Sequence, residues 1–544
     1  MSKTIITTMN KLAAGVAMGV TGLSMGYVAT AVATEADVAG FVENATYYRD
    51  GRGLSKFRNT AQLEVIKPVE SEGRWYNVTV NGVLRGTYDG VYDLNDDEFG
   101  ASSAPEAYLG EHWHPNDNPI VAFSPVKFPC ENGDAALCGN LDDYMDKDED
   151  DLKFPEFNDE LDFIRELYVD ATTDLSNGDQ FSVRVGKQQV VWGKTDLFRV
   201  LDVINPVDFS RHNIYDELED IRIPQWIAQA EWRMGPTAFL DDSNLSVVWN
   251  FDKFRPNNLG QCGSPYAILD AGCFFSARTP ALGGLPVISN VDVPNWQLSN
   301  TQGGIKWEGV AGDATFSLNA YTYRQQLPSL HANANPGAAG GIFEIQFPRV
   351  NLVGGSIDYY AQNIDSVLRL ETTYTEGEEV PAYVGGFAET DMFRYVLGVD
   401  KNLVIPALSS SAFLISGQLF GEHILDYRED LPNEEDNWIA TLLVKGWWMN
   451  NRLSPQVIIA HDVGAKATVV APSVEYLVDD NWKVNLALSL KTGGNEQFDT
   501  NALAAKFPGN PPMGVWEPLA RFTNGPIGVA NEEDEIQLTV RYSF

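Results

Sequence analysis

The chain ends in the stretch "EIQLTVRYSF", residues Glu535–Phe544, in which apolar and polar side chains alternate strictly. The apolar face carries Ile536, Leu538, Val540, Tyr542 and Phe544. A period of two is the pattern of a β-strand with one apolar face. A soluble β-sandwich could also end in such a strand, so this strand alone does not decide the fold.

The first 33 residues have the pattern of a secretory signal peptide. Lys3 and Lys11 precede an apolar run rich in Gly and Ala from Leu12 to Val32, which ends in the small residues Ala31-Val32-Ala33. We expect residues 1–33 to be removed on export. The alternative is a membrane-spanning helix, which the glycines in the run disfavour. No later stretch has 18 apolar residues, so we expect residues 34–544 to form a single domain without a transmembrane helix.

The acidic composition of the chain argues against nucleic acid as a partner. Asp and Glu number 75 against 38 Lys and Arg, for a formal net charge of −37. A chain this acidic will not bind nucleic acid by bulk attraction, so no nucleic-acid partner is expected.

Several other segments alternate in the same way, among them 226–234, 314–321, 368–374, 393–400 and 482–491. Their polar faces carry large charged groups beside small polar ones, which suits a water-filled lumen. The predicted lumen-lining residues are Arg369, Glu371, Arg394, Asp400, Lys483, Lys491 and Arg541. The pattern predicts an all-β fold: a transmembrane antiparallel barrel of roughly 16–18 strands, closed because hydrocarbon tolerates no unpaired strand edge.

The final strand resembles the assembly signal of bacterial outer-membrane barrels. Tyr542 and the terminal Phe544 carry this resemblance. It implies that the barrel-insertion machinery reads this strand and that the protein resides among the lipids of a Gram-negative outer membrane.

Three long connections are expected, Asp89–Glu160, Asp252–Asn300 and Lys491–Asp534, and other turns are short. This asymmetry is typical of barrels with long extracellular loops. Two of the connections hold the cysteines, Cys130 with Cys138 and Cys262 with Cys273. In an exported chain we expect two local disulfides, and a metal site built from all four is the weaker alternative.

Metal and catalytic motifs are weak. Asp146, Asp148 and Asp150 alternate as in a calcium loop, but Asp151 and Phe157 stand where an EF-hand needs Gly and Glu. An EF-hand is therefore rejected, and weak surface binding of Ca²⁺ stays open beside a solvated acidic loop. His112 and His114 form a lone "HWHP". No motif of a hydrolase, nucleotide-binding protein or metalloenzyme is present, so no metal, cofactor or enzymatic activity is expected.

One segment breaks the alternation. We expect a strand over Gln180–Trp192 that ends at Gly193, with Thr195 or Asp196 capping a short helical turn, followed by a non-alternating stretch over Thr195–Gln225. In a barrel such backbone must lie in the lumen or outside the hydrocarbon. We predict that it folds into the lumen as a constriction or caps a mouth of the barrel, and the alternative is a plain extramembrane loop. The constriction candidates, which we expect to face polar lumen walls, are Arg199, Asp202, Arg211 and Asp216.

With the barrel in place, a family resemblance becomes visible. "GFVENATYYRDGRGLSKFRNTAQLEV" (Gly40–Val65), "RVGKQQVVWGKTDLFRVLDVINPVDF" (Arg184–Phe209) and the terminal strand resemble the DUF1302 family of Gram-negative outer-membrane proteins. The resemblance implies the barrel fold over nearly the whole chain. More loosely, it implies work with an RND-type exporter of lipids or hydrophobic compounds and a periplasmic lipid carrier. It brings no catalytic residues.

Two functions follow as hypotheses. The first is an outer-membrane channel or transport protein for a small molecule, a lipid or another hydrophobic compound. The second is a surface binding or structural barrel that presents acidic loops pinned by disulfides. Measuring conductance through the barrel separates the two.

Overall fold

The computed structural model describes residues 36–71, 73–100, 147–195, 198–211, 218–260, 263–266, 287–333, 342–382, 386–429, 431, 434–464, 466–493 and 534–544. Several predicted features lie outside these residues: the signal peptide over residues 1–33, all four cysteines, His112, His114, Asp146, Asp196 and Asp216.

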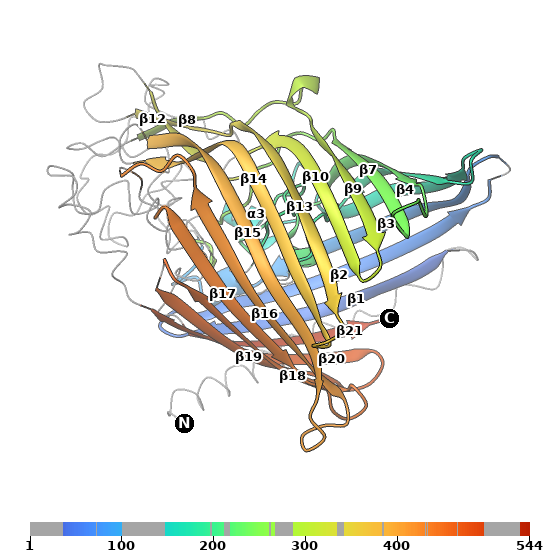
Figure 1. Ribbon diagram of the computed structural model, residues 1–544. Helices are drawn as coiled ribbons and strands as arrows, with labels where there is room; N and C mark the ends of the chain where they lie inside the picture. The colour runs from blue at the N-terminus through green and yellow to red at the C-terminus, as the bar shows by residue number, and fades with distance from the viewer. Residues whose placement is uncertain are drawn as a thin grey trace.

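Eighteen strands of the described residues form one antiparallel sheet that closes into a barrel (Figure 1). Each strand pairs with the next strand of the sheet, and the last pairs back with the first, from Phe41 opposite Ser543 to Arg49 opposite Glu535. The strands are β1 (Asp37–Arg49), β2 (Gly53–Val69), β3 (Tyr76–Asp89), β4 (Ile164–Asp174), β5 (Gln180–Gln188), β6 (Gln225–Arg233), β7 (Asp242–Asn250), β9 (Gln302–Ala311), β10 (Ala314–Arg324), β13 (Arg349–Ala361), β14 (Ser366–Ala382), β15 (Gly386–Val404), β16 (Ala412–Ile424), β17 (Asp436–Lys445), β18 (Leu453–Asp462), β19 (Ala467–Leu477), β20 (Trp482–Gly493) and β21 (Glu535–Ser543). The predicted barrel is confirmed, at the upper end of the expected strand count.

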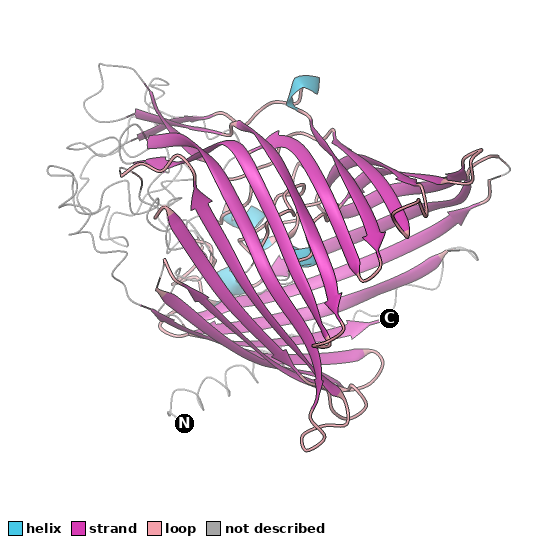
Figure 2. Cartoon of the chain, viewed as in Figure 1, coloured by secondary structure: helices cyan, strands magenta, loops and turns pink. Residues whose placement is uncertain are grey.

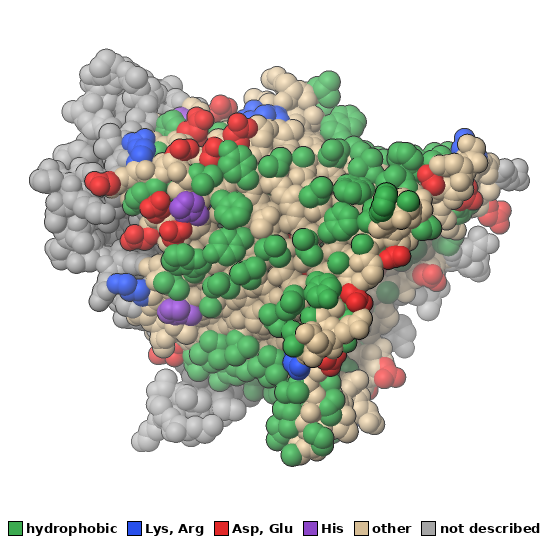
Figure 3. Space-filling model, viewed as in Figure 1, with side chains coloured by type: hydrophobic (Ala, Val, Ile, Leu, Met, Phe, Trp, Pro, Cys, Tyr) green, Lys and Arg blue, Asp and Glu red, His purple; other side chains and the backbone are tan. Residues whose placement is uncertain are grey.

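The outer face of the barrel is apolar. Leu318 on β10, Val353 on β13 and Leu397 on β15 are exposed on the outside. Ser317 on β10 and Thr373 on β14 are buried on the lumen side. Hydrophobic side chains cover much of the outer wall in Figure 3. An apolar exterior around a polar interior is the inverse of a soluble protein, and it identifies the barrel as one that lies in a membrane.

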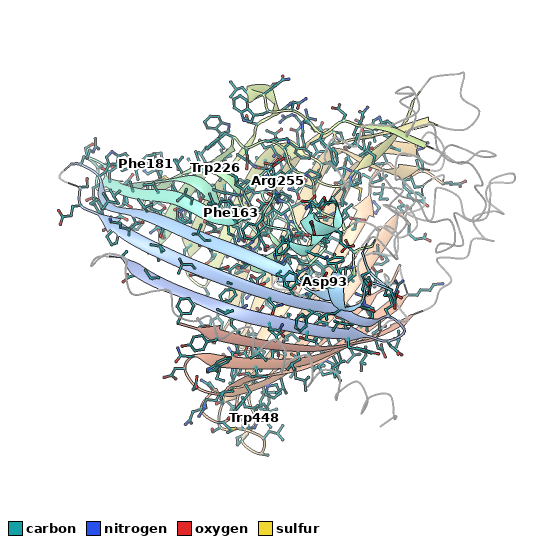
Figure 4. All side chains as sticks on the ribbon, turned by 180° about the vertical axis from the view of Figure 1, so that it is seen from behind. Asp93, Phe163, Phe181, Trp226, Arg255 and Trp448 are labelled. Atoms are coloured by element: carbon teal, nitrogen blue, oxygen red, sulfur yellow. The ribbon has the colours of Figure 1, made fainter. Side chains whose placement is uncertain are left out.

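Aromatic side chains gather at two levels of this wall. At one level Trp75 lies 6.3 Å from Phe181, and Trp482 lies 5.0 Å from Tyr542. At the other, Trp249 lies 5.4 Å from Phe251, and Trp226 stands at the start of β6. Phe181 and Trp226 appear at different positions along the barrel in Figure 4. Two aromatic girdles are typical of the two membrane–water interfaces.

The connections at the two ends of the barrel differ. At the turn end they are short, such as residues 312–313, 362–365 and 478–481. At the opposite end, the loop end, run residues 90–163, 189–224, 251–301, 325–348 and 494–534. The three long connections predicted from the sequence are all at the loop end, together with two more.

Short elements lie within the long connections. The helices are α2 (Val91–Leu94), α3 (Glu149–Lys153), α4 (Leu218–Ile221) and the 3-10 turn η4 (Leu298–Asn300), and Figure 2 shows helices inside the ring of strands. β8 (Val287–Val291), β11 (Ser329–Asn333) and β12 (Ile342–Gln346) form a separate three-stranded sheet that was not predicted. Among the described helices, none has the length and apolar character needed to span a membrane.

The expected end of the strand before the non-alternating segment was wrong. β5 ends at Gln188 rather than at Trp192, so Gly193 is not its breaking point. The physical reason is tertiary: the Asn205 side chain accepts a hydrogen bond from the backbone N–H of Val190 at 2.8 Å and donates one to the carbonyl of Gln188 at 3.3 Å. These bonds satisfy the backbone where it leaves the sheet.

The glycine that β5 requires is Gly186. Its φ is +147°, and a Cβ added there would lie 2.1 Å from the carbonyl oxygen of Leu167 on β4. Only a residue without a side chain allows β4 and β5 to approach at this point.

We therefore expect Gly186→Ala to destabilise the barrel by about 2–3 kcal/mol, because it adds both backbone strain and a steric clash. Thermal unfolding in detergent, followed by the shift in gel mobility of heated barrels, measures the effect. Gly82→Ala on β3 is the control, since the nearest atom to its Cβ is 4.0 Å away. Equal unfolding midpoints for the two variants would contradict the prediction.

Candidate functional site

The connection between β5 and β6, residues 189–224, folds into the lumen, and we call it the inner segment. Its side chains Trp192, Leu201 and Ile204 are buried against lumen-facing residues of β6, β7, β10 and β13. The rings of Trp192 and Tyr321 on β10 meet edge to face at 5.6 Å. The predicted inward fold is confirmed, and the plain extramembrane loop is excluded for the described part of the segment.

The connection after β7 joins the inner segment. Backbone bridges link Val207 to Arg222 and Asp208 to Asn258, and the N–H of Val207 donates to the Asn257 side chain at 2.8 Å. The described residues of the inner segment and of 251–260 thus form one hydrogen-bonded unit, which we call the inner body. The hydrogen bonds within it satisfy backbone groups that lie outside the barrel strands.

A buried ion cluster stabilises the inner segment from within. The Asp202 carboxylate is 2.7 Å from Arg222 and 3.5 Å from Arg199, and Arg199 also donates to the carbonyl of Asn205 at 2.7 Å. Asp202 is 1% exposed. Arg199 and Asp202, which we expected to face polar lumen walls, bind each other and Arg222, a partner that the sequence did not indicate.

A second cluster attaches the inner segment to the barrel wall. Arg211 lies 3.1 Å from Glu156, and Asp220 lies 2.7 Å from Arg85 on β3. Burial raises the pKa of Asp220, but the positive charges of Arg85, Arg211 and Arg165 outweigh it and lower the pKa to about 2. Of the constriction candidates, Arg211 therefore does reach across to other parts of the chain.

A third contact holds the connection after β7. Arg255, labelled in Figure 4, binds both oxygens of Asp162, at 2.8 and 2.6 Å, and Lys187 lies 2.9 Å from the same carboxylate. A bidentate pair of this kind fixes orientation as well as position. The inner body is thereby fastened to the wall at several points.

The predicted lumen-lining charges are found on the lumen side, each engaged by a partner. The ion pairs are Arg369 with Asp400 (2.7 Å), Arg394 with Glu378 and Glu422 (both 2.6 Å), Lys483 with Glu475 (3.3 Å) and Arg541 with Glu43 (2.6 Å). Glu371 accepts from the backbone N–H of Lys194 in the inner segment at 2.5 Å. Lys491 falls on the same face of β20 as Lys483, at the loop end. The sequence missed the partners Glu43, Glu378, Glu422 and Glu475, because cross-strand register is not visible from spacing.

The acidic stretch near α3 has a structural role among the described residues. Asp148 caps the helix: its carboxylate accepts from the N–H of Asp151 at 2.9 Å, and Asp151 accepts from the N–H of Asp148 at 3.2 Å. This is a capping box. Within the described chain no three His, Cys, Asp or Glu side chains gather as a metal site.

The inner body leaves a polar cavity of about 470 Å³ on one side of the lumen, which we call the polar passage. Its wall comes from β1–β3 and β16–β21, with Arg211 and Asp220 on the inner side. It reaches from Tyr47 and Lys56 in the loop half to Lys445 and Lys483 in the turn half. The charged lining residues are Lys56, Arg58, Arg85, Arg211, Lys445, Lys483, Arg541, Glu43, Asp220 and Glu475.

A second cavity, of about 380 Å³, lies between the inner segment and strands β10 and β13–β16, and we call it the apolar cavity. The inner segment contributes nine of its 21 lining residues, and the barrel wall contributes Tyr323, Val350 and Leu352 as well as the charged Glu378, Arg394 and Glu422. The segment side is formed by Phe198, Arg199, Val200, Asp202, Val203, Val207, Phe209, Leu218 and Ile221. The inner body therefore divides the lumen into a largely polar cavity and a largely apolar one.

Comparison with known proteins places the chain in a family. The model for "Protein of unknown function (DUF1302)" matches residues 8–544. Among solved structures, OccK3 (OpdO) of Pseudomonas aeruginosa is 10% identical, with 94% of this chain and 95% of that chain covered and a TM-score of 0.42. OccAB3 of Acinetobacter baumannii is 8% identical, covering 94% and 99%, with a TM-score of 0.42. The outer membrane channel DcaP of A. baumannii is 11% identical, covering 94% and 97%, with a TM-score of 0.36. A comparison with curated proteins returned no match.

The buried ion cluster around Asp202 leads to a prediction about the stability of the inner segment. Asp202→Ala would leave Arg199 and Arg222 without their carboxylate, at a cost of about 3 kcal/mol. We expect faster hydrogen exchange over the inner segment while β1 and β21 keep their protection. Asp208→Ala is the control, since among the described residues the Asp208 side chain bonds locally, to Ser210. Unchanged exchange in Asp202→Ala would show that the cluster does not hold the segment.

Proposed function

The chain belongs to the DUF1302 family, whose description assigns no function, and we propose that it is an outer-membrane channel that passes small molecules through the polar passage. The observation that supports this most directly is a lumen only partly filled. A barrel of eighteen strands encloses a wide interior. The inner body occupies one side of it and leaves a polar, charged cavity of about 470 Å³ on the other.

In this proposal the inner segment is a fixed constriction. The ion pair of Asp202 with Arg222 and that of Arg211 with Glu156 are largely buried, and breaking one partner of a buried pair is costly. Asp220, on the side of the passage, adds a more exposed ion pair with Arg85. A loosely held plug would need few such contacts. The segment therefore narrows the lumen permanently and leaves the passage beside it as the route for solute.

Removal of the constriction tests the proposal. Because Gln188 and Gln225 are register partners on β5 and β6, a four-residue Gly-Ser linker in place of residues 189–224 can close the hairpin. We expect the unmodified protein in a planar bilayer to show a small steady conductance, and the linker variant a conductance larger by about threefold or more.

The matched control places the same linker at residues 405–411, the turn between β15 and β16 at the opposite end. Its conductance should equal that of the unmodified protein. If both the unmodified protein and the inner-segment variant stay closed, the channel proposal fails. A surface-binding barrel would then be the better account.

The apolar cavity supports a second candidate: a site for a lipid or another hydrophobic compound. Val350 and Leu352 on β13 line this space together with Val200 and Val203 of the inner segment. A cargo that fits an apolar cavity is poorly soluble in water. Such a cargo would need a periplasmic lipid carrier and an exporter of the RND type to reach the outer membrane, and both stay proposals.

Filling the apolar cavity tests this candidate. Leu352→Trp adds bulk inside it, whereas Leu318→Trp makes the same change on the outer face, where Leu318 is 57% exposed. We expect mass spectrometry of the intact detergent-released protein to find a bound hydrophobic molecule in the unmodified protein and in Leu318→Trp. Occupancy should fall about tenfold in Leu352→Trp. If mass spectrometry finds no bound molecule in any of the three proteins, the proposal of a hydrophobic cargo fails.

A further inference from the structure

We propose that the polar passage selects anions, so that the solute it carries bears a negative charge such as a carboxylate or a phosphate. This inference rests on the proposed function as a channel and names the class of its cargo. It comes from the charges of the passage wall, which differ from those of the chain as a whole.

The wall of the passage is positively charged. Among its described lining residues are seven cations against the three carboxylates of Glu43, Asp220 and Glu475. Two further carboxylates reach lining arginines from outside the wall, Asp89 at 3.2 Å from Arg58 and Glu156 at 3.1 Å from Arg211. Among the described residues, the seven lining cations exceed these five carboxylates by two. The whole chain has the opposite balance, with a formal net charge of −37.

The carboxylates of the wall do not present negative charge alone. Glu43 is 2.6 Å from Arg541, Asp220 is 2.7 Å from Arg85 and Glu475 is 3.3 Å from Lys483. Each is thus compensated by a lining cation at short range. A solute in the passage meets ion pairs and additional positive charge rather than isolated carboxylates.

The cations are spread along the passage. In the loop half, the ammonium of Lys56 lies 4.3 Å from the ring of Tyr47 and 5.2 Å from the ring of Tyr266, beside Arg58 and Arg85. In the turn half stand Lys445, Lys483 and Arg541. A moving anion therefore finds positive charge in both halves of its path, which is what selective conduction needs.

The acidic groups elsewhere in the chain do not cancel this field. At physiological ionic strength, charges separated by more than about 8 Å of solution are largely screened from each other. Inside a narrow cavity with low-dielectric walls the nearby charges dominate and raise the local concentration of the opposite ion. The local excess of cations thus decides which ion enters.

The test is the reversal potential in a planar bilayer with a tenfold KCl gradient. We expect chloride to permeate more readily than potassium, by about threefold. The double variant Lys445→Gln/Lys483→Gln should lower the chloride-to-potassium permeability ratio about threefold, and Glu475→Gln should raise it. Lys401→Gln is the control, because the Lys401 ammonium donates to the carbonyl of Ile364 in a turn at the end of the barrel and not in the passage.

The outcomes separate this inference from the function on which it rests. A conducting protein that prefers potassium, or whose permeability ratio is the same in the double variant and in Lys401→Gln, would overturn anion selectivity and leave the channel in place. A protein that conducts no ion, even with residues 189–224 replaced by the linker, would overturn both.

Discussion

The structure depends on one constraint: a sheet in hydrocarbon cannot leave a strand edge unpaired. The pairing of β1 with β21 removes the last two edges, and residues Phe41–Arg49 and Glu535–Ser543 carry it. Phe544 completes the seam, since its backbone exchanges hydrogen bonds with Gly40 at 3.0 and 3.1 Å. On the lumen side of the same seam, Arg541 binds Glu43 at 2.6 Å. Strand β21 therefore closes the barrel and also contributes the charge of Arg541 to the polar passage.

A closed ring of eighteen strands encloses more space than its own side chains fill. The inner segment occupies part of this space with its own apolar residues and ion pairs. Trp192, Leu201 and Ile204 cover apolar residues on the lumen side of β6, β7, β10 and β13, while Arg211 and Asp220 face the charged wall of β2 and β3. This two-sided character of one segment is what divides the lumen into an apolar cavity and a polar passage.

Much of the barrel could be predicted from the sequence, because alternation is a local property. It located the terminal strand and the lumen-facing side of Arg369, Arg394 and Lys483. Properties that depend on contacts between residues far apart in the chain could not be predicted from the sequence. β5 ends at Gln188 because Asn205, 17 residues later, binds its backbone. Arg222 is the partner of Asp202, and Glu475 the partner of Lys483, only because folding brings them together. The small sheet of β8, β11 and β12 lies in connections whose sequence shows no clear period.

The central claim is that a narrow passage stays open beside a fixed inner segment. The most direct measurement is the conductance of the unmodified protein with neutral polymers of increasing size added to both sides of a bilayer. The account predicts a steady conductance that only the smallest polymers reduce, because larger ones cannot enter a passage of about 470 Å³. A complete absence of conductance, or its reduction by polymers large enough to require an unobstructed eighteen-stranded lumen, would contradict it.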